Sequence, residues 1–478
     1  MNSIANHRRK YGQHFTSTHI FHELIFPRIK SHLNQYIWVD LFAGAGNLVL
    51  PILEYIPKSE RVKFFQNHIF LCDIQQKCVE EIINNAKKYE IPEEIARNNI
   101  FLWDSLKSYP PKILEQEKIN SKPLFHITNP PYLYLGYIAK NSHTKSHLAY
   151  FQGKNKGYQD LYQIALMNDL RNSTDRMIYL IPTNFIFGNS VSNKIRDDFL
   201  PLYKIEHAYI YEKPIFDFTG MNVGIFFFKR KKSYNLEKSE FDAVKINTEK
   251  SQKHFILHPK YHYRAGTHFE EFVEKFKSHN PLKIHYYLQK LEVKKNFGNY
   301  SIKVIDANRF IGNSYEKTVI YVNKKMKQKI LANQLWVRTV DTGTWEGRAG
   351  LYNINASFKV NGIMVTKNTY RTNPIQIFFD TPISLKDQEL LREYVNFILE
   401  YLRSESDSEF LTSYKYSSGD YIRKYFGLSQ ARKIIETCPL LLMNSDEKIR
   451  FDQYIKTENV EKVLKICGKY SYKGKKNE

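Results

Sequence analysis

The sequence predicts an α/β protein whose first half forms a Rossmann-like sheet and whose second half forms a mixed α+β domain. From Gln35 to Lys229, short apolar runs alternate with turns and helical segments, which is typical of parallel strands joined by crossover helices. The first apolar run ends in the glycine turn Ala43-Gly44-Ala45-Gly46, a strand-to-helix connection. The length of 478 residues is sufficient for two domains with cores of their own.

Seven apolar segments of strand length follow one another in the first half. In order they are Ile37–Phe42, Ile69–Asp73, Ile100–Asp104, Leu124–Thr128, Arg176–Pro182, Lys204–Tyr211 and Val223–Phe228. The sequence between them predicts helices at Asn47–Ile56, after Asp73 and at Asp160–Leu170.

A basic run and a polar segment predict where the first domain ends. Lys229-Arg230-Lys231-Lys232 closes the alternating pattern, and Ser233–Ser239 has the composition of a linker. We therefore expect domains at residues 1–234 and 235–478. The second half mixes short strands such as Ile375–Phe379 with helices such as Leu385–Arg403, which gives the α+β class but no definite architecture.

The charge of the chain points to a polyanionic partner. The formal net charge is +22 and the pI is about 9.4. Residues before Asn235 carry 30 Lys and Arg against 21 Asp and Glu, and the remainder carries 41 against 28, so both halves are basic. Nucleic acid is the partner that this balance favours.

The cysteines and the apolar segments predict a cytoplasmic protein without a membrane segment. The four cysteines form no CxxC pair and no metal-ligand spacing, as is typical of reduced thiols, so we expect no metal site. Met1 to Lys10 is polar and basic without the apolar core of a signal peptide. No run approaches the 18 uninterrupted apolar residues of a membrane helix.

The most informative motif is Asn129-Pro130-Pro131-Tyr132, which follows the buried strand Leu124–Thr128. Two prolines stop the strand, because neither can donate to a sheet ladder. An Asn amide, a Pro carbonyl and an aromatic face are then presented together at the carboxyl end of a strand, where open α/β sheets bind ligands. This combination suits a planar exocyclic amine, whose two hydrogens meet two acceptors while its ring stacks on the aromatic side chain.

Acidic residues close three other strands of the same predicted sheet. Asp40 precedes the glycine turn, Asp73 ends the second strand and Asp104, with Ser105 beside it, ends the third. A carboxylate at Asp73 can accept both hydroxyls of a ribose, and one at Asp104 can accept from an adenine amine. A helix N-cap is the alternative role for each Asp. Gly46 is followed by Asn-Leu-Val, so the GxGxxG pattern of hydride-transferring enzymes is absent.

These motifs, in this order, resemble those of the S-adenosylmethionine-dependent DNA adenine-N6 methyltransferases of restriction–modification type. Lys10-Tyr-Gly-Gln-His-Phe-Thr16 resembles the leading cofactor segment of that family, although Ser17 replaces the usual Pro. Gly157-Tyr-Gln-Asp-Leu-Tyr162 resembles the segment after the catalytic motif, and Phe216–Gly224 resembles the motif whose aromatic packs on the target base. The resemblance covers about residues 8–232.

The resemblance implies a methyltransferase sheet with an antiparallel last strand, S-adenosylmethionine as cofactor and a target-recognition domain at the end of the chain. The implied catalytic residues are Asn129, Pro130, Pro131, Tyr132 and Phe218, with Phe216 as the alternative to Phe218. The implied cofactor-binding residues are Tyr11, Thr16, Asp40, Phe42, Gly44, Gly46, Asp73, Ile74, Asp104, Ser105 and Asn129.

The same resemblance implies double-stranded DNA as partner, a monomeric chain and a separately encoded restriction endonuclease acting on the same site. Because an adenine inside a duplex cannot reach such a pocket, the base must be flipped out, stacking on Tyr132 and Phe218. Two clusters of residues 235–478 have the composition of base readers. Their DNA-binding members are Arg338, Trp345 and Arg348 in the first, with Thr342 and Thr344, and Lys415, Arg423 and Lys424 in the second, on the loop that begins at Tyr414.

Four alternatives remain open at this point. Asn-Pro-Pro-Tyr also occurs in enzymes that methylate a glutamine amide, and the Gly-Gln-x-Phe opening occurs in ribosomal RNA adenine dimethylases. The chain could also be a DNA-specificity protein with an inactive methyltransferase fold, although its intact motif argues against this. Glu292-Val-Lys294 could be half of a fused nuclease motif, a pattern common by chance in a Lys-rich chain.

Overall fold

The computed structural model describes residues 16–212, 222–247, 249–342, 344–367, 369, 372–406, 410–413 and 424–472. The chain divides into two compact units, residues 1–265 and 266–478. None of the helices in the described part of the chain has the length and apolar composition needed to cross a membrane.

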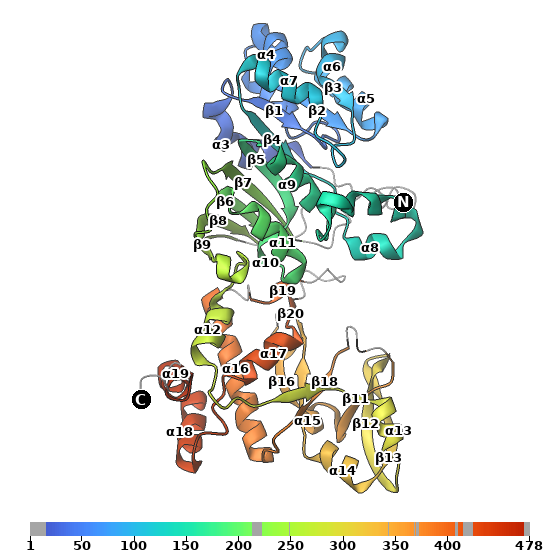
Figure 1. Cartoon of the computed structure of the whole chain (residues 1–478), viewed down its shortest axis with the longest axis vertical. Coiled ribbons are helices and arrows are strands. Elements are labelled where there is room, and N and C mark those ends of the chain that lie inside the picture. The colour runs from blue at the N-terminus through green and yellow to red at the C-terminus, as the bar shows by residue number, and fades with distance from the viewer. Residues whose placement is uncertain are drawn as a thin grey trace. The chain divides into compact units, whose positions relative to one another are not determined.

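In the described residues, a nine-stranded sheet is the framework of the first unit (Figure 1). Its spatial order is β3-β2-β1-β4-β5-β7-β6-β8-β9. The strands are β1 (Ile37–Asp40), β2 (Ile69–Asp73), β3 (Ile100–Leu102), β4 (Leu124–Thr128), β5 (Arg176–Pro182), β6 (Tyr203–Tyr211), β7 (Val223–Arg230), β8 (Ser239–Ile246) and β9 (Lys250–Leu257). The first five strands are parallel, and β7 runs antiparallel to both β5 and β6. The predicted α/β class and the antiparallel strand at Val223 are thus confirmed.

The helices of the first unit connect these strands. They are α2 (Thr18–Ile20), α3 (Phe26–Ile29), α4 (Arg61–His68), α5 (Gln76–Lys87), α6 (Glu93–Asn99), α7 (Pro111–Asn120), α8 (Leu135–Lys140), α9 (Leu161–Arg171), α10 (Asn184–Phe187) and α11 (Ser190–Phe199). One π-helix and six 3-10 helices complete the described set: η1 (Phe21–Ile25), η2 (Lys30–His32), η3 (Leu50–Tyr55), η4 (Lys58–Glu60), η5 (Ser142–Phe151), η6 (Gly153–Asn155) and η7 (Pro259–Tyr261). In place of the helix expected at Asn47–Ile56, the chain forms only the shorter 3-10 helix η3, because the turn that contains the glycines continues to Val49.

The boundary between the units lies after Ala265, not at Asn235 as the composition predicted. The strand β8 pairs in parallel with β6, and β9 pairs antiparallel with β8, so both extend the first sheet. The buried Arg196 of α11 donates to His262 O at 2.6 Å, which ties the following segment to the same unit. The polar segment Ser233–Ser239 is therefore a loop that ends at the first residue of β8, and its composition alone could not distinguish it from a linker.

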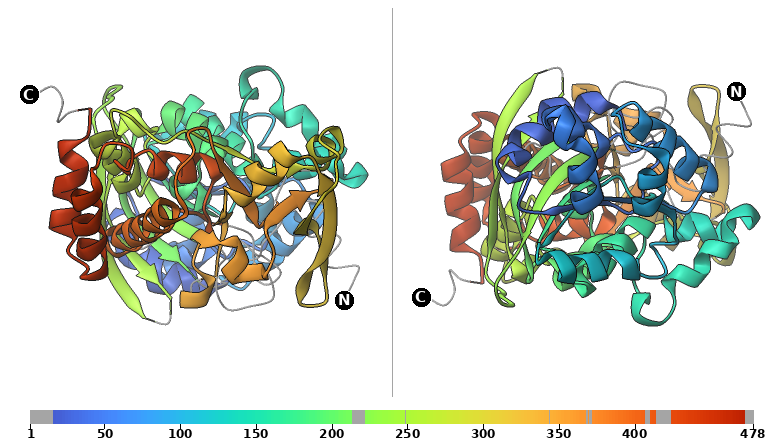
Figure 2. Two further views of the ribbon diagram at one scale, coloured as in Figure 1. Left: turned by 90° about the horizontal axis from the view of Figure 1, so that it is seen from below. Right: turned by 90° about the horizontal axis from the view of Figure 1, so that it is seen from above.

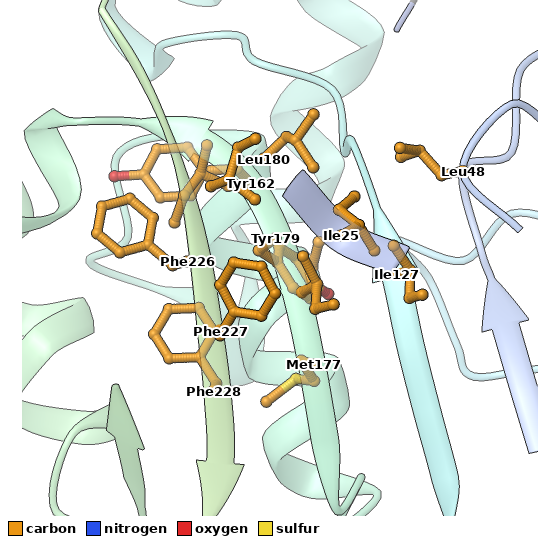
Figure 3. Packing of buried hydrophobic residues seen from close by; sticks show 14 of the residues in the cluster. Ile25, Leu48, Ile127, Tyr162, Met177, Tyr179, Leu180, Phe226, Phe227 and Phe228 are labelled. Carbon is orange, nitrogen blue, oxygen red and sulfur yellow. The ribbon is translucent and has the colours of Figure 1, made fainter. Parts of the chain in front are cut away.

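Both faces of the central strands are buried, as expected for a parallel sheet covered by helices. Ile37 and Val39 of β1 join one apolar cluster with Ile113 of α7, whereas Trp38 joins the cluster on the other face. In Figure 3, Met177, Tyr179 and Leu180 of β5 lie beside Phe226–Phe228 of β7, with Tyr179 opposite Phe226. This packing holds the carboxyl ends of β1, β4 and β5 in fixed relative positions.

The second unit has the mixed α+β composition that the sequence predicted. Its described strands form two four-stranded sheets, β10-β18-β14-β16 and β11-β17-β12-β13, and one three-stranded sheet, β15-β20-β19. They are β10 (Ile284–Tyr286), β11 (Leu288–Gln289), β12 (Tyr300–Ile311), β13 (Ser314–Val322), β14 (Leu335–Arg338), β15 (Val340–Asp341), β16 (Gly350–Asn353), β17 (Gly362–Val365), β18 (Ile375–Phe379), β19 (Thr412–Ser413) and β20 (Lys424–Tyr425).

The helices of the second unit include α16, the 22-residue helix Leu385–Ser406, whose apolar side packs in the largest cluster of this unit. The others are α12 (His268–Phe276), α13 (Lys290–Lys295), α14 (Lys324–Leu331), α15 (Ile354–Phe358), α17 (Leu428–Ile435), α18 (Ser445–Lys456), α19 (Val460–Lys469) and the 3-10 helix η8 (Trp345–Gly347).

Candidate active site

A pocket of about 850 Å³, including space open to solvent, lies at the carboxyl ends of β1 to β4. This is where open α/β sheets bind ligands. The predicted residues that line it are Thr16, Asp40, Phe42, Gly44, Asp73, Ile74, Asp104, Ser105, Asn129 and Pro131. The sequence reasoning missed Trp103, His147 and Tyr150, which also line it.

The glycine turn forms one wall of the pocket, and its two glycines act differently. Gly44 has φ +57° and lines the pocket, and its N–H donates to Asp73 Oδ2 at 3.0 Å. Gly46 has φ +82° and does not line the pocket; a Cβ there would lie 2.7 Å from Leu50 Cδ1. Gly46 therefore shapes the turn from behind, whereas the sequence placed it against the cofactor.

Asp40 and Asp73 are buried carboxylates held by backbone N–H groups and, for Asp40, also by the Thr128 hydroxyl. Asp40 Oδ1 accepts from Thr128 Oγ1 at 2.6 Å and from Phe42 N at 3.0 Å. Burial raises the pKa of Asp40 to about 7, although the nearby His126 and these donors oppose the shift. Burial also raises the pKa of Asp73, whose Oδ1 accepts from Gln75 N at 2.9 Å.

Asp104 offers the pocket an acceptor without a partner. Its Oδ2 accepts from Tyr150 Oη at 2.9 Å and lies 3.2 Å from Lys107 Nζ. Its Oδ1 is buried, and no donor in the described part of the chain bonds to it. Because a buried acceptor without a hydrogen bond costs about 1–3 kcal/mol, this atom marks a place where a ligand N–H would be stabilised.

Asn129 lines the pocket, and its amide is oriented by two side chains. Its Nδ2 donates to Thr16 Oγ1 at 3.0 Å, and its Oδ1 accepts from the Tyr132 hydroxyl. The same hydroxyl also lies 2.5 Å from Leu180 O of β5, so its single hydrogen is shared between the two acceptors. The predicted motif and the predicted Thr16 are therefore brought together around one amide group.

The Tyr132 ring is placed differently from the stacking platform that the sequence suggested. It is only 4% exposed, does not line the pocket and packs in the core of the first unit. A base could stack on this ring only after the ring became exposed. Pro130 is also buried, while Pro131 lines the pocket.

A buried polar network beneath the motif was not predicted. Leu41 N donates to His126 Nε2 at 3.1 Å, so the ring proton is on Nδ1, which faces Asp169 Oδ2 at 2.6 Å. Asp169 of α9 also accepts from Thr174 Oγ1 at 2.8 Å and from the Tyr179 hydroxyl. Both His126 and Asp169 are completely buried. A lone His within an apolar strand was the only sequence clue.

This network acts where β1 and β4 stop pairing. The backbone register between them ends at Val39 opposite His126, and the contacts Leu41 N to His126 and Thr128 to Asp40 then bridge the strands. These side-chain contacts thus hold the ends of β1 and β4 together, which fixes Asp40 relative to Asn129.

The segment Gly157–Tyr162 anchors the loop that follows the motif. Asp160 Oδ1 accepts from Leu133 N at 2.9 Å, and Leu135 N donates to Gln159 O at 2.8 Å. Burial raises the pKa of Asp160 to about 7. Of the remaining predicted residues of the first unit, Tyr11, Phe216 and Phe218 lie outside the described residues.

The two predicted base-reading clusters meet in the small sheet of the second unit. Val340 of β15 pairs with Tyr425 and Asp341 pairs with Lys424 of β20, which in turn pairs with β19. The sequence had treated these clusters as separate, and the loop 414–423, with Lys415 and Arg423, lies outside the described residues. Of Trp345, only its position at the start of η8 is described.

The two arginines of the first cluster have partners within the protein. Arg338 Nη1 donates to Glu346 O at 2.9 Å, and its Nε donates to Val340 O at 3.3 Å. Arg348 Nη1 lies 3.8 Å from Asp341, and its Nε lies 3.6 Å from Glu400. In this arrangement both guanidinium groups brace the loop between β15 and β16.

The family of the chain follows from its sequence together with this fold. Residues 1–330 match the family described as N-6 DNA methylase. The chain belongs to the N-6 DNA methylase family. Membership in a DNA methylase family does not favour the RNA and glutamine-amide alternatives. A search among curated proteins finds no match for this N-6 DNA methylase.

Solved structures of restriction–modification enzymes are similar to this methylase. MmeI, a Type IIL restriction-modification enzyme in complex with DNA, has 13% identity and a TM-score of 0.51 over 98% of this chain and 74% of its own. The DrdV–DNA complex has 12% identity and a TM-score of 0.41 over 64% of this chain, which spans 36% of the DrdV chain. The M protein of EcoKI, a Type I restriction enzyme, has 12% identity and a TM-score of 0.34, over 68% and 66%. The MmeI similarity shows that the fold extends over nearly all of this methylase.

Proposed function

We propose that this methylase is a site-specific DNA methyltransferase that transfers a methyl group from S-adenosylmethionine to N6 of an adenine flipped out of duplex DNA. The observation that carries the proposal is the position of Asn129 on the pocket that Asp73 and Asp104 line. One pocket thus combines acceptors for a nucleoside cofactor with an amide suited to an exocyclic amine.

The residues of the pocket fit S-adenosylmethionine. The carboxylate of Asp73 would accept the ribose hydroxyls, and the unpartnered Oδ1 of Asp104 would accept from the adenine amine of the cofactor. Asp40, buried beside the glycine turn, would face the positive charge of the bound cofactor. When bound, the cofactor supplies an electrophilic methyl group.

Asn129 would act on the attacking nitrogen of the target base. The lone pair of adenine N6 is delocalised into the ring, so the amine is a poor nucleophile. The Asn129 Oδ1 and the Pro130 carbonyl would accept its two hydrogens, which favours a tetrahedral nitrogen with its lone pair directed at the methyl group. Oriented dipoles also stabilise the positive charge that develops on N6. Thr16 and Tyr132 hold the Asn129 amide in place and thereby pre-orient this acceptor.

Sequencing of DNA from a host that expresses the protein tests this proposal. We expect N6-methyladenine at one recurrent sequence, absent from DNA of a host that expresses Asn129→Ala. Methylated RNA or methylated protein with unmodified DNA would contradict the proposal.

We further propose that one chain acts as a monomer and that the modification protects DNA from a separate endonuclease with the same site. Sedimentation with duplex DNA tests the first point, and digestion of the modified DNA with that endonuclease tests the second.

We expect acid to weaken cofactor binding through Asp40. Because its pKa is raised to about 7, the free protein binds a proton there below that pH, and a cationic ligand must displace it. The dissociation constant measured by calorimetry should therefore rise as the pH falls from about 8 to 6, approaching tenfold per pH unit below the pKa. Asp40→Asn, which cannot ionise, should flatten this profile. An equally steep profile in Asp40→Asn would assign the effect to another group.

We expect changes at Arg338 or Arg348 to relax the choice of base at one position of the site, provided that the guanidinium group exchanges its partners within the protein for a base when DNA binds. A bidentate arginine–base contact contributes about 1–3 kcal/mol of discrimination. Methylation of a library of randomised duplexes by wild type and each Arg→Ala variant measures the effect. Identical site preferences would place base reading elsewhere, most simply on the loop that joins β19 to β20.

A further inference from the structure

The second unit has a concentrated excess of positive charge between Lys290 and Lys329. This segment carries nine Lys and one Arg against three acidic residues. Each acid already has a cationic partner: Glu292 with Lys329, and both Asp306 and Glu316 with Arg309. Within the described residues, the eight remaining lysines form no ion pair, so their charge is not neutralised by the protein.

Four of these lysines gather at one point, where two helices meet. Asn323 N donates to Asn296 O at 2.7 Å, which joins the start of α14 to the end of α13. Lys294 and Lys295 are on one side of this contact and Lys324 and Lys325 on the other, and all four side chains are exposed. We call this group, Lys294, Lys295, Lys324 and Lys325, the lysine junction.

The fold gives the lysine junction a rigid base. The hairpin of β12 and β13 buries Ile302 and Ile320 against Val293 of α13 and Met326 of α14. Lys327 lies over the Tyr300 ring at 4.9 Å. This body lies at one end of the second unit, and α18 and α19 lie at the other (Figures 1 and 2).

Structural roles do not account for the lysine junction. Lys324 and Lys325 occupy the first turn of α14, where positive charge opposes the helix dipole and costs stability. Lysines on β13 could guard a sheet edge against pairing, but the lysine junction is on helices. Four cations held close together without counter-charges also repel one another.

We propose that the lysine junction binds the phosphate backbone of duplex DNA outside the base-reading part of the second unit. The proposal rests on the proposed function, since it assigns a further contact to the same DNA. Duplex DNA is the polyanion that this chain meets as a substrate, and lysine contacts to phosphates add affinity for every sequence equally. The contact would hold the duplex in register without contributing to base choice.

A variant with Lys294→Gln, Lys295→Gln, Lys324→Gln and Lys325→Gln tests the proposal in the full chain. Binding of a fluorescent duplex without the recognised site is measured by anisotropy at several salt concentrations. We expect the affinity at about 0.1 M salt to fall more than tenfold. The slope of log K against log salt should become shallower by up to about 0.9 for each lysine that contacts a phosphate. The same four positions changed to Arg should restore both quantities.

The matched control removes four exposed cations at the other end of the unit: Arg450, Lys456, Lys462 and Lys465, each to Gln. Of these four, only Lys456 forms an ion pair within the described residues, with Asp452, and such an exposed pair contributes little. Lys462 lies over the Tyr454 ring at 5.1 Å. We expect this control to keep the wild-type slope, and the lysine-junction variant to keep its melting temperature, its site preference and its kcat at saturating DNA while its KM for DNA rises.

The outcomes separate this inference from the proposed function. An unchanged salt slope in the lysine-junction variant, or an equal loss in the control, overturns the inference while methylation by wild type stands. Lost affinity for structured RNA or anionic vesicles with unchanged duplex binding also overturns it. A wild type that binds duplex DNA but methylates nothing contradicts the proposed function alone, and one that does not bind duplex DNA contradicts both.

Discussion

Asn129→Ala is expected to lower the rate of methyl transfer by at least about 10²–10³-fold while S-adenosylmethionine still binds. Loss of one oriented polar group at a developing charge typically costs this much in kcat. The substitution removes the amide that Thr16 and Tyr132 orient and leaves Asp73 and Asp104 in place. Single-turnover transfer to duplex DNA and calorimetry with the cofactor measure the two properties separately.

A matched variant shows whether orientation of the amide matters. Tyr132→Phe removes the hydroxyl that bonds to Asn129 and Leu180 but keeps the buried ring. We expect it to transfer methyl groups at a rate between those of wild type and Asn129→Ala. Wild-type turnover by Asn129→Ala would remove the catalytic role assigned to this residue.

Asp73→Ala is expected to weaken cofactor binding by at least about 100-fold. A carboxylate that accepts two ribose hydroxyls forms two charge-assisted hydrogen bonds of about 1.5–3 kcal/mol each. The substitution also releases the Gly44 and Gln75 N–H groups, so the glycine turn loses its fixed partner. Titration calorimetry gives the dissociation constant directly.

The comparison with Asp73→Asn separates the two contributions. The amide keeps one acceptor oxygen for the turn but loses the negative charge, so its affinity should lie between those of wild type and Asp73→Ala. An unchanged dissociation constant in Asp73→Ala would place the ribose elsewhere in the pocket.

The sheet and most of the pocket wall could be predicted because their determinants are local. An apolar run that ends in Asp or in Asn-Pro-Pro specifies a strand and the group at its carboxyl end. Parallel strands then bring these ends together, as the pocket around Asp40, Asp73 and Asn129 confirms. The roles of these residues remain proposals.

The unpredicted part of the site depends on contacts between distant segments. His126 bonds to Asp169, and the hydroxyl of the buried Tyr132 bonds to Leu180 O. Neither contact can be predicted without knowing how α9 and β5 are placed against β4. Composition showed each residue, but no local pattern specifies its partner. The unit boundary after Ala265 could not be predicted for the same reason, because nothing in the polar sequence before β8 indicates that β8 pairs with β6.

The three-stranded sheet β15-β20-β19 has a consequence for evolution and engineering of specificity. It joins segments far apart in the sequence through Val340 with Tyr425 and Asp341 with Lys424. A relative that exchanged only one of these segments by recombination would inherit mismatched strand partners. Exchange of both segments as one cassette would preserve the pairing. If the two segments read bases, as proposed above, hybrids between related methylases should fold and acquire a new target sequence only when their crossover points enclose both segments.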